Sequence, residues 1–459
     1  MTDGAKPAAQ ILDGLTRRAH VQVRSSRDLV ENVATEAQAE DKKRKGKELP
    51  VLRRRSGLRP VQGRGAAQTI EITPWQALHA IGRGLVLARQ GAGRGLAEHW
   101  QSLKYCQALG QDRAGYLELS SEGRNPERYY KANQSSEIGI GFAVLVAEQF
   151  LKDRYPDHMV SLIDSDIALQ AGWALRNKGP AKGRRPEALL RRPNFILEVW
   201  RPGEPSRVFL IASKGTHGKP AQVYAQLATG TAHLDSVHIG AYGRTPGFLL
   251  GTELADKGSI VVHVVEAPGE VLLRPGRGEK DTPNLDIELT DRNEHTTMKM
   301  PSQARSSDVN DFGFQVSTDL FGWFSQVLAR TEAAALTAFT GGGRPTAQYL
   351  TKEQGKRHFD LPMYAGADSV KDAEYTIHGT NFVGTDHVFR LNKTRVEAFS
   401  GLAEPLFNHL EHGDVASYRQ EVYRERADWP TSTTAPKWGP VSIRPDGSVM
   451  AMRILPPTT

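Results

Sequence analysis

The stretch that decides the fold runs from residue 193 to residue 216 and reads PNFILEVWRPGEPSRVFLIASKGT. Two apolar runs within it, Phe195–Trp200 and Val208–Ile211, have the length and the branched or aromatic residues typical of buried β-strands. The segment between them, 201–205, contains Pro and Gly and is typical of a turn. The stretch therefore predicts two adjacent strands, with a polar Lys-Gly-Thr sequence at the end of the second.

The neighbouring segments extend this pair into a mixed sheet. A helix that is apolar on most sides, and therefore buried, is expected from Ser135 to Asp153, and a strand from Met159 to Asp164. A second helix is expected at 220–231 and two later strands at 233–240 and 259–266. The order helix, three strands, helix, strand, strand predicts an α/β fold. Its first three strands form a meander, and its second helix crosses over to the later strands.

The whole chain has 459 residues, which favours more than one domain. The expected segments are a basic, partly disordered N-terminal arm (1–68), a helical segment (69–130), the α/β core (131–270), loops or a linker (271–310), and a C-terminal α+β region ending in a β-hairpin (311–459). Within the arm, residues 41–65 are rich in Lys and Arg. This run is either a solvated linker or an arm that lies along a phosphate backbone.

The core resembles the PD-(D/E)XK nuclease superfamily, and within it the restriction-endonuclease-like proteins of actinobacteria. The resemblance covers about residues 130–270. Pro193-Asn194 stands where the family has Pro-Asp, and Ala212-Ser213-Lys214 stands where it has acid-any-Lys. The resemblance also implies supporting roles for Glu137 on the first helix and for Gln222 and Gln226 on the second. In the family, the two acids hold Mg²⁺ and the Lys positions the attacking water.

Two departures from the family pattern concern the metal ligands. Asn194 replaces the first acid with a neutral amide, and Ala212 replaces the second with a side chain that has no ligand atom. A site built from hard oxygen donors thereby loses most of its attraction for Mg²⁺. We therefore expect a protein that keeps Lys214 but does not hydrolyse phosphodiesters.

An alternative keeps the nuclease active with relocated acids. Glu198 shares a strand face with Asn194 because residues alternate along a strand. It would need a slip of two residues, about 6.6–6.8 Å, to replace the first acid. Asp164, Asp166 and Glu137 are the other carboxylates that would then hold Mg²⁺.

Basic residues directly precede the strand that begins after Asn194. They are expected to contact nucleic acid together with Lys214, Gln222 and Gln226, and they are Lys178, Lys182, Arg184, Arg185, Arg191 and Arg192. Each candidate also has a purely structural alternative. Glu137 would cap its helix, Asp164 and Asp166 would form a turn, and the glutamines would be surface residues.

Composition narrows the class of protein. The formal net charge is +7, which favours encounter with polyanions. The single cysteine, Cys106, excludes a disulfide framework within the chain and points to the cytoplasm. No stretch reads as a signal peptide or a membrane helix.

The leading hypothesis is a nucleic-acid-binding protein that no longer cuts. DNA is preferred over RNA as its partner, and the resemblance suggests defence against foreign DNA, alone or beside a partner subunit or a second copy. The alternatives are an active Mg²⁺-dependent nuclease and a scaffold that binds no nucleic acid.

Overall fold

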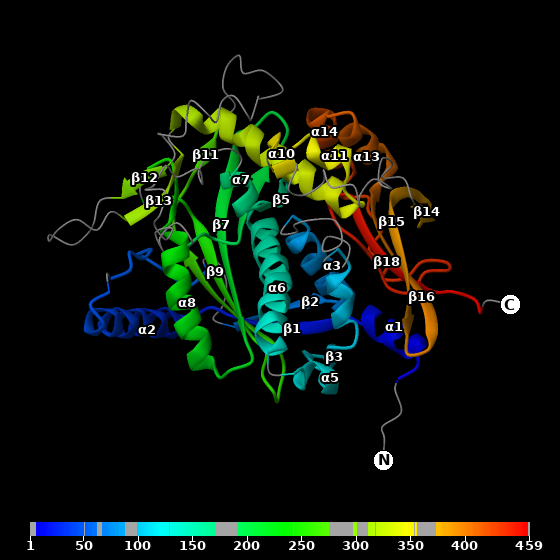
Figure 1. The fold of residues 1–459 in the computed structure, drawn as a ribbon, viewed down its shortest axis with the longest axis horizontal. Coiled ribbons are helices and arrows are strands. Elements are labelled where there is room, and N and C mark those ends of the chain that lie inside the picture. Colours follow the sequence, from blue (N-terminus) through cyan, green and yellow to red (C-terminus); the bar gives the residue numbers. More distant parts are fainter. Residues whose placement is uncertain are drawn as a thin grey trace.

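The computed structural model describes residues 6–49, 51–61, 67–87, 99–127, 129–170, 191–241, 243–274, 297–300, 311–316, 318–352, 354–355 and 373–457. In this part of the chain the largest sheet has eight strands (Figure 1). Seven follow the order β2-β1-β10-β9-β7-β6-β5, and β11 pairs with β7 beside this path. The strands are β1 (Ala19–Arg24), β2 (Ala67–Ile72), β5 (Met159–Asp164), β6 (Phe195–Trp200), β7 (Ser206–Thr216), β9 (Gly247–Glu253), β10 (Val261–Ala267) and β11 (Leu272–Leu273).

Strand directions confirm the expected fold class, an α/β protein with a mixed sheet. β5, β6 and β7 form an antiparallel meander. β9 is parallel to β7, and the connection between them carries helix α8 (Pro220–Leu234). β10 is antiparallel to β9.

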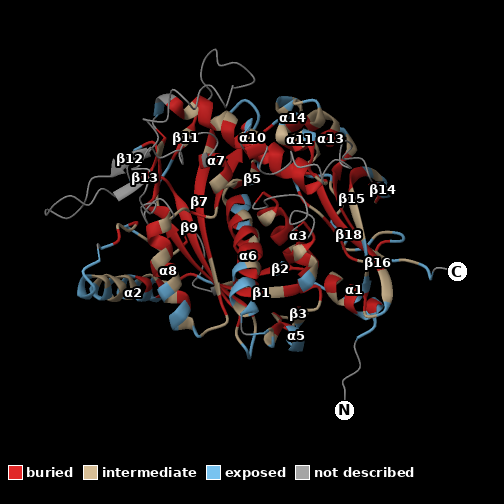
Figure 2. Ribbon diagram, viewed as in Figure 1, coloured by how far each residue is buried: buried red, intermediate tan, exposed pale blue. Residues whose placement is uncertain are grey.

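Two helices cover opposite faces of this sheet (Figure 1). α6 (Tyr130–Arg154) packs on the face that carries Phe209 and Ile211, whereas α8 packs on the face that carries Leu210 and Ala212. Figure 2 shows β7 and β9 largely buried between them. α6 begins five residues before the expected start at Ser135, so Glu137 lies in its second turn and does not cap it.

The N-terminal arm, which we expected to be basic and partly disordered, contains regular elements in its described residues. α1 (Ala8–Thr16), β1 and α2 (Arg27–Gly46) are ordered, and β1 pairs in parallel with β10 and antiparallel with β2. The apolar residues Ile11, Val21 and Val23 anchor this segment in the core. The high charge of this segment drew attention away from these buried residues, because a strand of six residues such as β1 has only a few apolar side chains.

Four arginines of the basic run are held by the protein itself. Arg53 Nε lies 2.5 Å from Asp235, Arg54 contacts Glu40 at 2.7 Å, and Arg55 donates to the carbonyl oxygens of Thr245 and Pro268. Arg59 Nη2 lies 3.6 Å from Glu266. The lysine-rich end of α2 is exposed, as Figure 2 shows in pale blue, and the exposed lysines there and directly after the helix are Lys42, Lys43, Lys45 and Lys47.

The later strands also differ from expectation. The strand expected at 233–240 is β8 (Val237–Ile239), which belongs to a separate three-stranded sheet with β12 (Thr297–Met300) and β13 (Asp311–Val316). The crossover from β7 leads to β9, which we did not predict. β9 contains two glycines that weaken a strand signal, yet both are needed: a Cβ at Gly247 would lie 2.5 Å from the Leu210 carbonyl oxygen.

The described residues of 69–130 are less helical than expected. Besides α3 (Pro74–Leu85), which the Thr73 side chain caps, they hold a 3₁₀ turn, a short hairpin and one helical turn. These are η1 (Gln101–Tyr105), β3 (Leu109–Gln111), β4 (Leu117–Leu119) and α5 (Ser121–Arg124). The expected linker at 271–310 contains strands β11 and β12.

The C-terminal region is α+β and ends in a hairpin, as predicted. Its antiparallel sheet follows the order β14-β15-β16-β18-β17. The strands are β14 (Ala373–Ile377), β15 (Thr380–Leu391), β16 (Thr394–Ala403), β17 (Val441–Ile443) and β18 (Ser448–Ile454). The remaining helical elements among the described residues are α7 (Ser165–Gln170), η3 (Thr318–Leu320), α10 (Phe321–Phe339), α11 (Arg344–Ala347), α13 (Glu404–Glu411) and α14 (Val415–Glu425).

Helix α10 joins the two regions. Its first half packs Trp323, Phe324 and Val327 into the core shared with α8. Its second half packs Leu336 and Phe339 into the core shared with α6 and the C-terminal sheet. The C-terminal region is therefore fixed against the eight-stranded sheet.

Candidate functional site

The two positions that lack acids lie opposite each other on adjacent strands. Phe195 pairs with Ile211, which places Asn194 across from Ala212. The Asn194 backbone N–H donates to the Ile211 carbonyl oxygen at 2.7 Å, and its side-chain Oδ1 accepts from the Ser213 N–H at 2.8 Å. The Asn194 amide thus extends the ladder between the strands, a role that a neutral side chain fills without a cation.

Lys214 lies on the same strand face as Ala212, two residues further along β7. We call the face that carries Asn194, Ala212 and Lys214 the Lys214 face. Lys214 is half-buried, and it makes no hydrogen bond or ion pair with any residue that the structure describes. Burial lowers the pKa of its ammonium group. A cation that has lost part of its hydration without gaining a carboxylate is stabilised by any anion that reaches it.

The residues near Lys214 add little charge of their own. Burial and the positive charge of Lys214 lower the pKa of His233, on α8, to about 4, so His233 is neutral at pH 7. Its Nδ1 lies 2.8 Å from the Arg192 carbonyl oxygen, which orients the ring. Gln226 is on the same helix, and its Oε1 is buried without a hydrogen-bond partner. His233 and Gln226 on α8 thus offer Lys214 no negative charge, and Glu253, which pairs with Thr216 further along the same face, is held by His263 at 2.9 Å.

Glu198 does not supply the missing acid. It pairs across the strands with Val208, which is six residues from Lys214 along β7, or about 20 Å at the rise of a strand. Glu198 is fully buried, and its Oε2 lies 2.5 Å from Arg419 Nη2 on α14. The same nitrogen lies 3.2 Å from Glu332 on α10. We call these two carboxylates and one guanidinium, Glu198, Glu332 and Arg419, the Arg419 cluster.

Asp164 and Asp166 also lie apart from Lys214. Asp164 pairs with Phe195, whose side chain packs in the α6 core, so it belongs to the opposite face of the sheet. Its Oδ1 accepts from the Ile167 N–H at 2.9 Å at the start of α7. Burial and the nearby charge of Asp166 raise the pKa of Asp164 to about 7. Asp166 in turn accepts a 3.0 Å hydrogen bond from Arg192.

Glu137 is directed toward η1. Its Oε2 accepts a 2.7 Å hydrogen bond from the Tyr105 hydroxyl and lies 2.7 Å from Lys104 Nζ. The four carboxylates of the relocated-acid hypothesis are therefore scattered over three places. Within the described ranges, no group of three or more His, Cys, Asp or Glu side chains is placed to hold a metal ion.

The structure describes only some of the residues that we expected to contact nucleic acid. Lys178, Lys182, Arg184 and Arg185 lie outside the described residues. Arg192 contacts Asp166, and its guanidinium lies 5.8 Å from the centre of the Phe314 ring. Arg191 lies close enough to His233 to contribute to lowering the pKa of that ring. Gln222 is exposed and accepts a long hydrogen bond of 3.4 Å from Thr216 Oγ1 at the end of β7.

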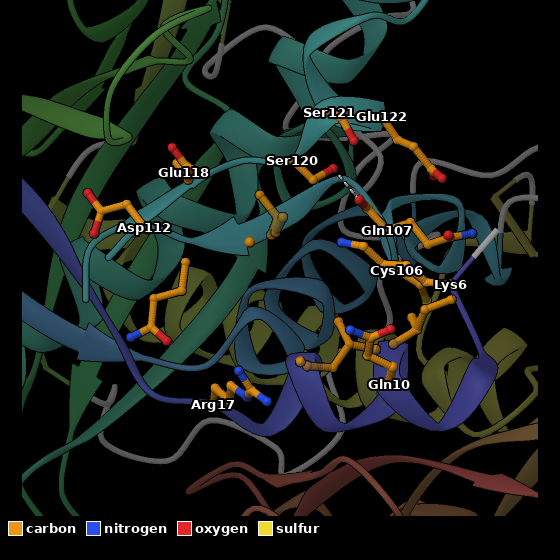
Figure 3. A pocket seen from close by; sticks show the side chains of 16 residues that line it. Lys6, Gln10, Arg17, Cys106, Gln107, Asp112, Glu118, Ser120, Ser121 and Glu122 are labelled. Atoms are coloured by element: carbon orange, nitrogen blue, oxygen red, sulfur yellow. Dashed lines mark hydrogen bonds between the residues drawn. The ribbon is translucent and has the colours of Figure 1, made fainter. Parts of the chain in front are cut away.

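Two cavities in the described part lie away from Lys214. One of about 430 Å³ is bounded by α1, η1, the β3–β4 hairpin and α5; Figure 3 shows Arg17 and Gln10 on one side of it and Ser120 and Glu122 on the other. A second of about 520 Å³ lies between the C-terminal half of α6, β2 and the β17–β18 turn. Both are lined by acids and bases together, so neither favours a ligand of one charge.

Two exposed side chains that sequence reasoning missed lie at the start of α6. They are Tyr129 and Tyr130, which are 70% and 52% exposed. A pair of adjacent aromatic residues within a polar run, between Glu127 and Lys131, was the available signal.

No family model, no curated protein and no solved structure matches this chain. No helix among the described residues is both long enough and apolar enough to cross a membrane.

Proposed function

We propose that this chain binds nucleic acid at the Lys214 face and does not hydrolyse it. The observation that carries the proposal is Lys214 itself, a half-buried ammonium group without a carboxylate partner among the described residues. A phosphate would supply the missing negative charge through a charge-assisted hydrogen bond. Asn194 and Ala212, which face each other beside it, offer no anionic ligand for Mg²⁺.

Two further features support binding. The β5-β6-β7 meander and the following helix α8 were expected, and the sequence of this segment resembles that of PD-(D/E)XK nucleases, whose substrates are nucleic acids. The exposed lysines at the end of α2 add positive charge beside α8, against which α2 packs. DNA rather than RNA, a cytoplasmic location, a partner subunit or second copy, and a role against foreign DNA are parts of the proposal that rest on the resemblance and on composition alone.

Fluorescence anisotropy with labelled single-stranded and double-stranded DNA and with RNA tests the binding. We expect affinity to fall steeply between about 50 mM and about 200 mM salt, because phosphate contacts release counterions. Lys214→Met should weaken binding about tenfold and reduce the slope of log affinity against log salt by about 1. Lys152→Met, an exposed lysine at the opposite end of α6, is the matched control and should bind like the unmodified chain.

Incubation with plasmid or single-stranded DNA in Mg²⁺ or Mn²⁺ tests the absence of hydrolysis. We expect intact substrate. Cleavage that disappears in Lys214→Met would establish an active nuclease and overturn that half of the proposal. Absence of binding to all three nucleic acids at low salt would overturn the other half and leave the scaffold hypothesis.

A further inference from the structure

Tyr129 and Tyr130 form an exposed aromatic pair at the start of α6. Their ring centroids are 4.3 Å apart with an interplanar angle of 34°, and 70% and 52% of the two residues is exposed. Aromatic rings that fill a core are covered by other side chains, whereas these two chiefly cover each other. They therefore offer ring faces to solvent in a segment that gains little stability from them.

The pair lies at the same end of the sheet as Lys214, but on the face covered by α6, whereas Lys214 lies on the face covered by α8. Five residues after Tyr130, the Ser135 carbonyl oxygen lies so close to Gly215 that a Cβ there would stand 1.8 Å from it. Lys131, the next residue after the pair, is near enough to His217 to help lower the pKa of that imidazole. The start of α6 thus lies against the end of β7 and the loop that follows it; in Figure 1 this is the edge marked by α5.

The charge around the pair is mixed but leaves cations available. Lys131 and Lys219 have no ion-pair partner within the described ranges. The acids in the same area are Asp256, which acts on His217, and the exposed Glu127. Lys219 is exposed and Lys131 is partly exposed. Accessible lysines beside exposed ring faces are the combination with which proteins hold single strands: the backbone follows the positive charge and the bases stack on the rings.

We propose that Tyr129 and Tyr130 are a stacking platform for unpaired bases, which makes single-stranded nucleic acid the preferred ligand of the Lys214 end of the sheet. Bases inside a duplex already stack on one another and expose only their edges. Their ring faces are therefore not accessible for stacking on the two tyrosines. This inference rests on the proposed function, because a strand held at Lys214 would reach the tyrosines by passing around this end of the sheet.

The test compares two double variants on single-stranded and double-stranded DNA of the same sequence, by anisotropy. Tyr129→Ala/Tyr130→Ala should weaken single-strand binding about tenfold or more and leave duplex binding within about twofold. Tyr129→Phe/Tyr130→Phe keeps the ring faces and should bind as the unmodified chain does, which separates stacking from folding. Val388→Ala, an exposed apolar residue of the C-terminal sheet, is the surface control. Photo-crosslinking to a single strand containing 5-iododeoxyuridine should label the peptide that contains the pair.

Each outcome separates the two proposals. Single-strand binding that is unchanged in the alanine variant but lost in Lys214→Met overturns the platform and keeps the proposed function. Equal losses on both forms of DNA also overturn the platform. No binding of any nucleic acid by the unmodified chain overturns both. A change in oligomeric state of the alanine variant, measured by sedimentation, without a change in DNA affinity would show that the pair contacts another copy of the chain.

Discussion

Two groups of buried charge in this molecule follow opposite rules. In the Arg419 cluster, the guanidinium of Arg419 lies within 3.2 Å of two carboxylates and above the Trp200 ring, 4.5 Å from its centre. At Lys214, a half-buried cation has no such partner among the described residues. Buried charge that serves the fold is usually paired, because desolvation without compensation is costly. By this comparison, the partly desolvated ammonium group of Lys214 lowers the stability of the fold. Such a cost is expected of a residue whose negatively charged partner belongs to a bound ligand.

The largest effect should come from breaking the cluster. Arg419→Met leaves Glu198 and Glu332 buried without a cation, and we expect a loss of about 3–5 kcal/mol in the free energy of unfolding. Urea unfolding followed by circular dichroism measures it. Arg424→Met, an exposed position on the same helix, should change stability by no more than about 0.5 kcal/mol. A loss below about 1 kcal/mol for Arg419→Met would remove the contrast with Lys214.

Asp164 should give the next largest effect. Its pKa is about 7 in the folded chain against 3.8 for an ordinary Asp, so between those values the unfolded chain releases this proton first. This group therefore makes stability fall as pH rises from about 4 to about 7, and the deficit stays constant above. Asp164→Asn keeps the Oδ1 acceptor for Ile167 and should be more stable than the unmodified chain by about 2 kcal/mol at pH 8.

The two chains should be equally stable at about pH 2.5, well below 3.8, where Asp164 is protonated in both the folded and the unfolded state. Thermal melts at both pH values make the comparison. A variant that is less stable than the unmodified chain at pH 8 would show that the carboxylate is paired.

Lys214→Met should change stability in the direction opposite to Arg419→Met. Removing an unpaired half-buried ammonium group relieves its desolvation, so the free energy of unfolding should stay the same or rise by up to about 1 kcal/mol. The same urea series measures it. A loss of 2 kcal/mol or more, as an order-of-magnitude threshold, would mean that Lys214 has a structural partner after all.

The smallest effect is expected from divalent metal. Addition of about 10 mM MgCl₂ should leave the melting temperature unchanged, because a ligand that does not bind the folded chain adds no stability. Melts in EDTA give the baseline. A rise in melting temperature that Asp164→Asn abolishes would return the chain to the active-nuclease hypothesis.

The fold was predictable where local patterns carried it. The strands at 159–164 and 195–200, α8 and the final hairpin follow from apolar runs, turns and caps within a few residues of one another. β9 was missed because its glycines are required by contacts with Leu210 and α8, which sequence spacing does not reveal. The ordered N-terminus was missed for the same reason: β1 pairs with β10, far away in the chain.

The site was predictable in its parts but not in its pairing. The opposition of Asn194 and Ala212 followed from two aligned strands. The fate of Glu198 depends on Arg419, 221 residues later, and that of Asp166 on Arg192, 26 residues later. Ion pairs between distant segments produce no periodic pattern in the sequence. The sequence therefore indicates candidate carboxylates, and the fold shows which of them are already paired with an arginine.

The parallel pairing of β1 with β10 has a consequence for synthesis on the ribosome. Val23 meets its neighbour Val262 only after more than half of the chain has been made. Until then β1, although it can pair with β2, has an unpaired edge on its other side. A chain truncated before β10 should therefore aggregate, and one truncated after it should complete the sheet. β1 is the first strand to be synthesised, and it is among the last to complete its pairing in the sheet.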